Sequence, residues 1–380
     1  MSKLTIYSED VHDYVLLAYT DIILESEYNN KIQLITYSGK LDRLSSVSSH
    51  LFSQKIFDIR KFQSMGDNPK SRFLEILKKT FIKTPRFLMN SLKLTILLLK
   101  QRKQETIIAT EIYKKTHAFL LYFISLKLKN IQLILTIHNA DKFTKKKNIF
   151  NALFTHSKRI IVLSDSVCRY LSKNTNKPIS VFPAAIPSSN TINLRKSKID
   201  KLNNSSLSFC VTGSVDQNRK DYFKIIKYFS KIRNINCKVI FLGKLVTKEL
   251  KQFAIDMGVD VVFFDDYVED NVFKSMISEA HFLFSLNSNE DYLQGKISGI
   301  MYDALRYGVP LMTDNPTFES NYIEHISIFD FSDFNLKITK YSDRSEYNKI
   351  AKKALNKSKE ALPVNLLNNN KTIKDFINEL

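Results

Sequence analysis

The chain has 380 residues, 44% of them hydrophobic, with eight glycines, three cysteines and no tryptophan. That length predicts two domains of about 150–200 residues each, and that apolar share excludes a disordered or low-complexity protein. The formal net charge of +19 lies mostly in residues 1–190, where 30 Lys and Arg stand against 14 Asp and Glu, so we expect the first half to meet an anionic partner or surface.

The first half contains six apolar runs that read as strands, separated by more polar stretches. They lie at residues 3–8, 31–38, 105–110, 131–139, 159–164 and 179–183. Strands with such continuous apolar character are typical of a parallel sheet covered on both faces. We therefore predict an α/β domain with a long basic insertion between its second and third strands.

The basic insertion at 60–103 holds twelve Lys and Arg and two acids. Apolar residues recur in it at helical spacing on both sides of Pro85. Amphipathic segments with basic flanks can lie in an anionic membrane interface, and the basic run at 142–147 could extend that surface. They can equally form a core-facing helix pair with a solvated basic face, and the sequence leaves both interpretations open.

Neither a leader nor a membrane span is indicated. Acidic residues follow the first strand almost at once, which is not typical of a signal peptide, and the longest apolar runs fall well short of the roughly 20 residues of a spanning helix. Cys168, Cys210 and Cys237 are far apart and lack CxxC spacing, so we interpret them as structural thiols in a reducing compartment. We expect a cytoplasmic protein, with any membrane contact peripheral at the inner face of the cell membrane.

The second half alternates more regularly between strands and helices. Strand-like runs lie at 207–213, 237–243, 259–264, 281–286 and 309–314, and helical stretches at 219–232, near 246–257, near 269–279 and from about 296 to 307. This order predicts right-handed βαβ units in a second parallel sheet. Ligands bind such sheets at the carboxyl ends of the strands.

These patterns divide the chain into two parallel-sheet domains and a tail. Residues 187–206 are polar and show no apolar stripe, so we expect an interdomain linker there. The domains then span 1–186 and 207–340. Residues 341–380 read as helical stretches broken at Pro363 and predict a C-terminal helical tail.

Three of the eight glycines fall in one short run, QGKISGIMYDALRYGVPLMTDN. On the predicted helix, Lys296, Gly299 and Asp303 line up on the face opposite the apolar side chains. Gly295 and Gly299 would let a phosphate approach the backbone, where Lys296 and the helix dipole favour its charge. Asp303 could accept hydrogen bonds from a ribose diol. With Ser298 in the same turn, the spacing suits a nucleoside diphosphate at this helix end.

A second group of candidate residues follows the first strand of the second half. Gly213 and Ser214 open a turn, and Arg219 and Lys220 start the next helix. If both groups lie at one sheet edge, the two cations reach the same pyrophosphate. The alternative is that the cations are solvated first-turn residues and that Gly308 merely ends a helix.

Three segments of the second half, VTGSVDQNRKDY, FDDYV and GKISGIMYDALRYGVPLMTD, resemble the C-terminal donor domain of GT-B glycosyltransferases. Residues 159–187 resemble the end of the N-terminal domain of that family, and the resemblance covers about 130–340. It implies two Rossmann-like parallel-sheet domains facing a cleft, a nucleotide-sugar co-substrate, and no cofactor or metal, because helix ends and cations can neutralise the leaving diphosphate.

The resemblance also implies roles for single residues. Arg219 and Lys220 would hold the diphosphate, and the loop around Tyr267 would border the base. Many retaining members carry two Glu residues eight positions apart in this motif. Here the later position is Asp303, which keeps a carboxylate for the ribose, and the earlier one is Gly295. The sugar and the stereochemical course stay open.

Two histidines are candidates for catalysis. His138 ends a predicted strand at the cleft, where family members often carry a histidine near the donor sugar. His12 follows the first strand, in the loop that usually faces the acceptor. Imidazole titrates near neutral pH, so either could act as a general base, and either could instead be a capping or wall residue. No histidine spacing indicates a metal site.

Three functional hypotheses result. The first is a glycosyltransferase that moves a sugar from a nucleotide-diphosphate donor to a hydroxyl of a cell-surface glycan, such as a capsule or O-antigen, on a lipid carrier. The second is a nucleotide-sugar epimerase on the same fold, which needs no acceptor. The third is a basic adaptor that binds membrane or nucleic acid without catalysis. The nearly neutral second half and the lack of a nucleic-acid-binding motif speak against nucleic acid.

Overall fold

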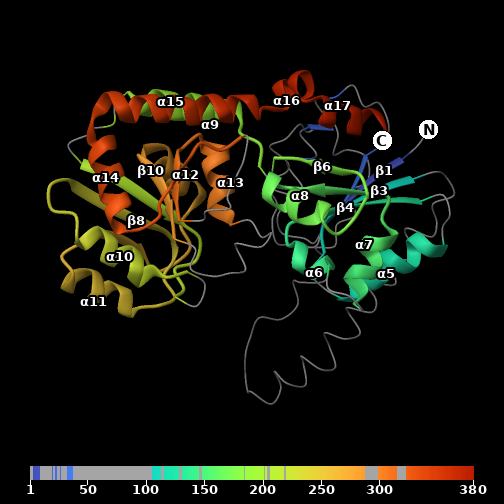
Figure 1. Cartoon of the computed structure of the whole chain (residues 1–380), viewed down its shortest axis with the longest axis horizontal. Coiled ribbons are helices and arrows are strands. Elements are labelled where there is room, and N and C mark those ends of the chain that lie inside the picture. The colour runs from blue at the N-terminus through green and yellow to red at the C-terminus, as the bar shows by residue number, and fades with distance from the viewer. Residues whose placement is uncertain are drawn as a thin grey trace, which may run out of the picture. The chain divides into compact units, whose positions relative to one another are not determined.

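The structure is a computed structural model of the chain, drawn in Figure 1. It forms two compact units. Unit 1 comprises Met1–Val162, Leu171–Val181 and Asp375–Leu380, and unit 2 comprises Leu163–Tyr170 and Phe182–Lys374. The residues that the structure describes are 3–8, 19, 22–23, 26, 32–36, 105–112, 115–127, 131–144, 148–183, 185–200, 202, 206–217, 220–286, 298–314 and 322–380.

Unit 1 is built on a parallel sheet of six strands in the order β2-β1-β3-β4-β5-β6. The strands coincide with the six predicted runs, and most of the described Ile, Leu and Val side chains of β1, β3, β4 and β5 are buried. They are β1 (Lys3–Ser8), β2 (Ile32–Thr36), β3 (Glu105–Glu111), β4 (Ile131–Ile137), β5 (Arg159–Val162) and β6 (Ile179–Val181). The described helices of this part of the chain are α5 (Lys115–Lys127), α6 (Ala140–Thr144), α7 (Ile149–His156) and α8 (Asp165–Ser172).

Unit 2 holds a second parallel sheet of six strands, in the order β12-β11-β10-β7-β8-β9. The strands are β7 (Ser206–Thr212), β8 (Asn236–Lys244), β9 (Asp260–Phe264), β10 (Phe282–Ser285), β11 (Leu311–Thr313) and β12 (His325–Ser327). The described helices are α9 (Ser189–Ile199), α10 (Tyr222–Ser230), α11 (Glu249–Asp256), α12 (Asp270–Glu279), α13 (Gly299–Tyr307), α14 (Phe331–Ser342), α15 (Arg344–Glu360), α16 (Pro363–Asn369) and α17 (Lys371–Asn378), whose second half belongs to unit 1. The strand order reverses between β7 and β10. After β7 the chain adds β8 and β9 on one side of it, and then adds β10, β11 and β12 on the other side.

The predicted linker at 187–206 is mostly helical in the structure. Helix α9 begins after a capping box in which Ser188 and Thr191 bond each other's backbone N–H groups. Its buried residues are Ile192, Arg195 and Ile199, and the two isoleucines belong to the core of unit 2. The apolar stripe is narrow and carries a buried arginine in its middle, which is why the segment reads as polar.

The C-terminal segment is helical, as predicted, and it contributes to both units. Tyr347 and Ala351 of α15 are fully buried in the core of unit 2. The last six residues belong to unit 1. Phe376 in this segment is 1% exposed, and the Arg159 guanidinium lies over its ring. The same guanidinium forms an ion pair with Glu379 at 2.8 Å.

A cluster of aromatic rings forms the centre of unit 2. The Phe209 ring on β7 packs against Phe229, Phe282 and Phe284 with centroid distances of 4.8, 5.5 and 6.1 Å. All four side chains are at most 4% exposed. Such edge-to-face and stacked pairs add to the free energy of burial and fix the helices on the sheet.

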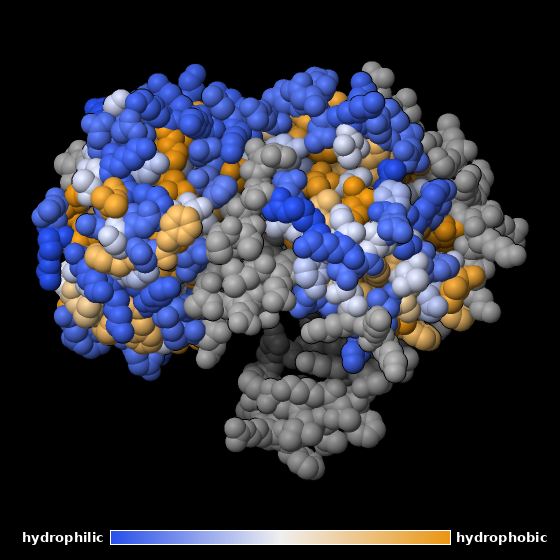
Figure 2. Space-filling model, in the orientation of Figure 1, coloured by the Kyte–Doolittle hydropathy of each residue, from blue (hydrophilic) through white to orange (hydrophobic). Residues whose placement is uncertain are grey.

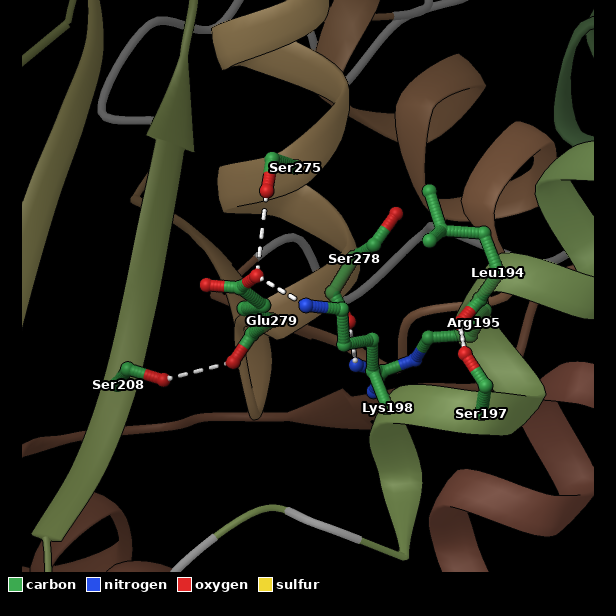
Figure 3. A network of polar contacts seen from close by, with 8 residues as sticks. All are labelled: Leu194, Arg195, Ser197, Lys198, Ser208, Ser275, Ser278 and Glu279. Carbon is green, nitrogen blue, oxygen red and sulfur yellow. Dashed lines mark hydrogen bonds and ion pairs between the residues drawn. The ribbon is translucent and has the colours of Figure 1, made fainter.

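A buried arginine joins three helices of unit 2. Arg195 is 0% exposed, and its guanidinium donates to the carbonyls of Ser278 and Ala280, both at 2.8 Å, and to the Tyr347 hydroxyl at 2.9 Å. The side chain therefore caps the C-terminus of α12 and ties it to α15. Figure 3 shows the surrounding contacts, including the ion pair at 2.6 Å between Lys198 and Glu279 on the outer side.

The hydropathy of the helices and of the surface, and the state of the cysteines, can be described for the two units. In the part of the chain that the structure describes, no helix is long and apolar enough to cross a bilayer. On the face drawn in Figure 2, apolar side chains form separate patches on a largely hydrophilic surface. The three cysteines are thiols and form no disulfide, and burial raises the pKa of the Cys210 thiol above its usual range and that of Cys237 to about 12.

Candidate functional site

The candidate site lies at the carboxyl ends of β7 and β10, where the strand order of unit 2 reverses. In open α/β sheets the crevice outside this reversal is the usual ligand site. Helix α13 packs on both strands. It therefore brings its own residues to the end of β7, which carries Thr212 and the turn that follows.

Three predicted residues meet there around a threonine that the sequence analysis did not single out. The Thr212 hydroxyl donates to Oδ2 of Asp303 at 2.6 Å, and the Lys220 ammonium donates to the Thr212 carbonyl at 3.3 Å. Gly213 follows directly in the chain. Thr212 and Lys220 are 3% and 9% exposed, so these contacts are shielded from bulk water and stronger than surface ones.

The Asp303 carboxyl group is buried although the residue as a whole is half-exposed. Burial raises its pKa to about 6, against the opposing effects of the Thr212 hydrogen bond and of the charges on Arg306 and Lys220. The group is therefore mainly ionised at pH 7 and becomes protonated just below pH 6. A carboxylate in this state accepts hydrogen bonds from hydroxyl groups.

Two glycines shape the turn after β7. Gly213 has a φ of +100°, which L side chains rarely adopt. Gly243 near the end of β8 lies against it: a Cβ at Gly243 would stand 2.1 Å from the Gly213 carbonyl oxygen. The sequence analysis noted only that a strand ends at Gly243, because the approach of two strand ends does not show in a linear pattern.

The loop after Gly213 is held by its own polar contacts. The Tyr222 hydroxyl donates to the Ser214 carbonyl at 2.8 Å. The Gln217 side chain accepts from the Tyr222 amide at 2.9 Å and donates to Asp221 at 3.1 Å, while its backbone amide donates to the Thr247 hydroxyl at 3.0 Å. These contacts hold the backbone of Ser214 in place at the end of β7.

Helix α13 begins at Gly299, three residues later than predicted. Ser298 is its N-cap residue and is 3% exposed, and its side chain makes no capping hydrogen bond. Gly299 is exposed at the helix start. The Ser298 side chain thus leaves the first amide groups uncapped, although the Met301 amide donates to the Ser298 carbonyl at 3.0 Å. The helix ends at Gly308, which has a φ of +62° and so also acts as the helix stop considered above.

Three residues predicted for the site lie outside the described residues. They are Arg219, Gly295 and Lys296. Their roles toward the diphosphate stay predictions.

Tyr267 stands at a different part of the same sheet edge. It follows β9 and is 79% exposed, and the Lys244 ammonium lies 5.7 Å from its ring centroid. Lys244 also pairs with Asp266 at 2.8 Å, which raises the pKa of the lysine. An exposed ring with a cation beside it is a suitable platform for a planar base, and the predicted contact to the base stays a prediction.

Of the two candidate catalytic histidines, the structure describes His138. It is half-buried and directly follows β4, at the carboxyl edge of the sheet of unit 1. His12 lies outside the described residues. Among the residues that the structure describes, no cluster of His, Cys, Asp or Glu could hold a metal ion.

Comparison with known proteins gives matches at the level of structure. No protein-family model matches the chain, and no curated protein matches it by sequence. A glycosyltransferase from Rickettsia africae ESF-5 gives a TM-score of 0.62 at 11% identity, covering 99% of this chain and 97% of that one. HepE of Anabaena, solved with UDP and glucose, gives 0.64 at 14% identity over 99% and 100%. The apo form of WaaB, a lipopolysaccharide outer core galactosyltransferase, gives 0.60 at 14% identity over 99% and 98%.

These matches confirm the predicted fold class. The chain has the GT-B fold, with two Rossmann-like parallel-sheet units and a helical C-terminal segment. At 10–14% identity the likeness extends to the fold, and function has to be argued from the site.

Proposed function

We propose that the protein is a glycosyltransferase that moves a sugar from a nucleoside-diphosphate donor to a hydroxyl of a cell-surface glycan carried on a lipid. The observation that carries the proposal is the meeting of Thr212, Lys220 and Asp303 at the strand-order reversal of unit 2. HepE, with the same fold, was solved in complex with UDP and glucose, which supports a sugar donor of this class. WaaB is a lipopolysaccharide outer core galactosyltransferase, which supports a cell-surface glycan acceptor.

In the proposed reaction, the acceptor oxygen forms a bond to the anomeric carbon of the sugar as the bond from that carbon to the diphosphate breaks. His12 or His138 accepts the hydroxyl proton. Arg219, Lys220 and the amide groups at the start of α13 stabilise the negative charge on the leaving diphosphate. Asp303 binds the ribose hydroxyls and holds the nucleotide in place.

Binding of nucleotides to the purified protein tests the donor site. We expect one of UDP, GDP, CDP and ADP to raise the melting temperature selectively, because a ligand that binds the folded state stabilises it. Stabilisation by none of the four would contradict the proposal. Turnover of the matching nucleotide sugar in the absence of any acceptor would instead indicate the epimerase.

Asp303→Ala should weaken binding of the preferred nucleotide about tenfold to a hundredfold, the equivalent of losing hydrogen bonds to a charged group worth about 1.5–3 kcal/mol. Calorimetric titration measures this. Folding should be little changed, since the variant also removes a buried carboxylate whose desolvation is unfavourable. Asp256→Ala, at an exposed position on α11, is the matched control, and equal affinities for the two variants would contradict the role of Asp303.

We also propose that the basic insertion at 60–103, which lies outside the described residues, binds the anionic inner face of the cell membrane and so brings the enzyme to its acceptor. Lys78, Lys79, Lys83 and Arg86 are the residues to replace with Gln. Each basic residue near such a surface contributes about 1 kcal/mol, so we expect the four replacements to release the protein from phosphatidylglycerol vesicles in a sedimentation assay.

The matched control for the vesicle assay is Lys352→Gln with Lys353→Gln, which removes exposed cations of α15. It should leave binding unchanged. If the wild-type protein does not sediment with the vesicles, the membrane proposal is wrong and the alternative, a core-facing helix pair with a solvated basic face, is favoured.

A further inference from the structure

The bond between Thr212 and Asp303 joins a strand end to the middle of a helix. Thr212 is the last residue of β7, and Asp303 lies one turn into α13. At 2.6 Å this is a short hydrogen bond between a hydroxyl and a carboxylate, the charge-assisted kind that is stronger than a bond between neutral groups. Among the described residues, Thr212 is the one side chain that donates a hydrogen bond to Asp303.

A purely structural role explains this bond poorly. Helix α13 is already fixed by six buried side chains, which are Ile300, Met301, Tyr302, Ala304, Leu305 and Tyr307. Among the described residues no cation forms an ion pair with Asp303, and burying such a carboxylate is unfavourable, so that burial raises its pKa to about 6. A neutral side chain at this position would hold the helix at lower free-energy cost, so the carboxylate has a different role.

Hydrogen bonds also fix the backbone of Thr212 and of the next residue. The Lys220 ammonium donates to it at 3.3 Å, and Gly213 continues the chain with its amide bonded to the Leu242 carbonyl at 3.2 Å. The end of β7 thus cannot turn freely, and the hydroxyl keeps a constant direction toward α13.

We propose that Thr212 is a positioning residue, whose hydroxyl holds the Asp303 carboxylate in the orientation that binds the ribose diol of a nucleoside diphosphate. The inference rests on the proposed donor site. Thr212 acts through Asp303 and does not itself touch the nucleotide. A carboxylate held in one orientation loses less rotamer entropy when the ligand binds than a mobile one does.

The hydrogen bond from Thr212 can be measured through its effect on the pKa of Asp303. Among the described residues, Lys220 and Arg306 both favour the ionised form, and the Tyr307 phenol also interacts electrostatically with Asp303. Removing the hydrogen bond from Thr212 removes stabilisation of the ionised form and raises the pKa of Asp303 further. Because the ionised form binds the diol, affinity is lost as pH falls through that pKa, and the loss then begins at higher pH.

The test compares the affinity of Thr212→Val, Thr212→Ser and the wild type for UDP, or for whichever of GDP, CDP and ADP the wild type binds instead, by calorimetric titration between pH 5 and pH 8.5. Val keeps the shape of Thr without its hydroxyl, and Ser restores the hydroxyl. Asp303→Asn supplies the baseline, because a terminal phosphate titrates with a pKa near 6. We expect Thr212→Val to bind about tenfold more weakly at pH 7, with its pH midpoint about one unit higher, and Thr212→Ser to resemble the wild type.

The outcomes separate this inference from the proposed function. If the wild type binds UDP and Thr212→Val binds it with the same affinity and pH midpoint, Thr212 has no positioning role while the donor site stands. A lower melting temperature of Thr212→Val with an unshifted midpoint also overturns the inference, since the bond would then be structural only. If the wild type binds none of the four nucleoside diphosphates, the proposed donor site is wrong, and the inference about Thr212 is wrong as well.

Discussion

Gly243→Ala is expected to destabilise unit 2 by about 2–3 kcal/mol, the range of an overpacked interior, and to abolish nucleotide binding. The added Cβ would stand 2.1 Å from the carbonyl oxygen and 2.6 Å from the carbonyl carbon of Gly213. Since these are backbone atoms, no side-chain rotation relieves the clash. The turn that presents Ser214 and Lys220 has to move. Urea unfolding and a UDP titration measure the two effects.

Gly258→Ala is the matched control for this variant. Gly258 has a φ of +65° and open space where a Cβ would lie. It should therefore show only the strain of a left-handed alanine, about 1–2 kcal/mol, with unchanged affinity for UDP because it follows α11, away from the turn. If Gly243→Ala retains full affinity, the turn after β7 does not shape the nucleotide site.

Arg195→Met should destabilise unit 2 by about 3 kcal/mol or more. The variant keeps most of the apolar stem but leaves the Ser278 and Ala280 carbonyls and the Tyr347 hydroxyl without their donor. Each unsatisfied buried group costs about 1–3 kcal/mol. The measurement is the free energy of unfolding in urea, followed by circular dichroism.

Lys198→Met removes the neighbouring cation on the same helix, shown in Figure 3, and serves as the comparison. Its ion pair with Glu279 lies at the surface, with side chains 33% and 48% exposed, and such pairs contribute about 1 kcal/mol or less. A loss of stability no larger for Arg195→Met than for Lys198→Met would show that water or a rearranged side chain replaces the guanidinium.

The sheets could be predicted from the sequence because their evidence is local. Continuous Ile, Leu and Val runs, as in β4 and β8, identify buried parallel strands without knowledge of their neighbours. Helix α9 was missed for a physical reason. Its buried face includes Arg195, and the favourable contacts of that side chain come from carbonyls about 80 residues away in the sequence.

The same distinction holds for the candidate site. Gly213, Lys220 and Asp303 carry chemistry in their residue types and could be placed at one sheet edge by pattern alone. Thr212 reads as an ordinary β-forming residue, and its partner Asp303 lies 91 positions away. Gly243 matters because of a close approach between two strand ends. Both roles depend on tertiary contacts that a single sequence does not display.

The division of unit 1 into three stretches of chain has a consequence for its synthesis. The strands of its sheet are synthesised before unit 2, whereas the residues from Asp375 to Leu380 that complete it are synthesised after unit 2. Until Phe376 and Glu379 reach Arg159, β5 lacks these contacts. Unit 1 therefore reaches its final packing only after the whole of unit 2 has been synthesised, and a ribosome that stops within α17 leaves unit 1 incomplete.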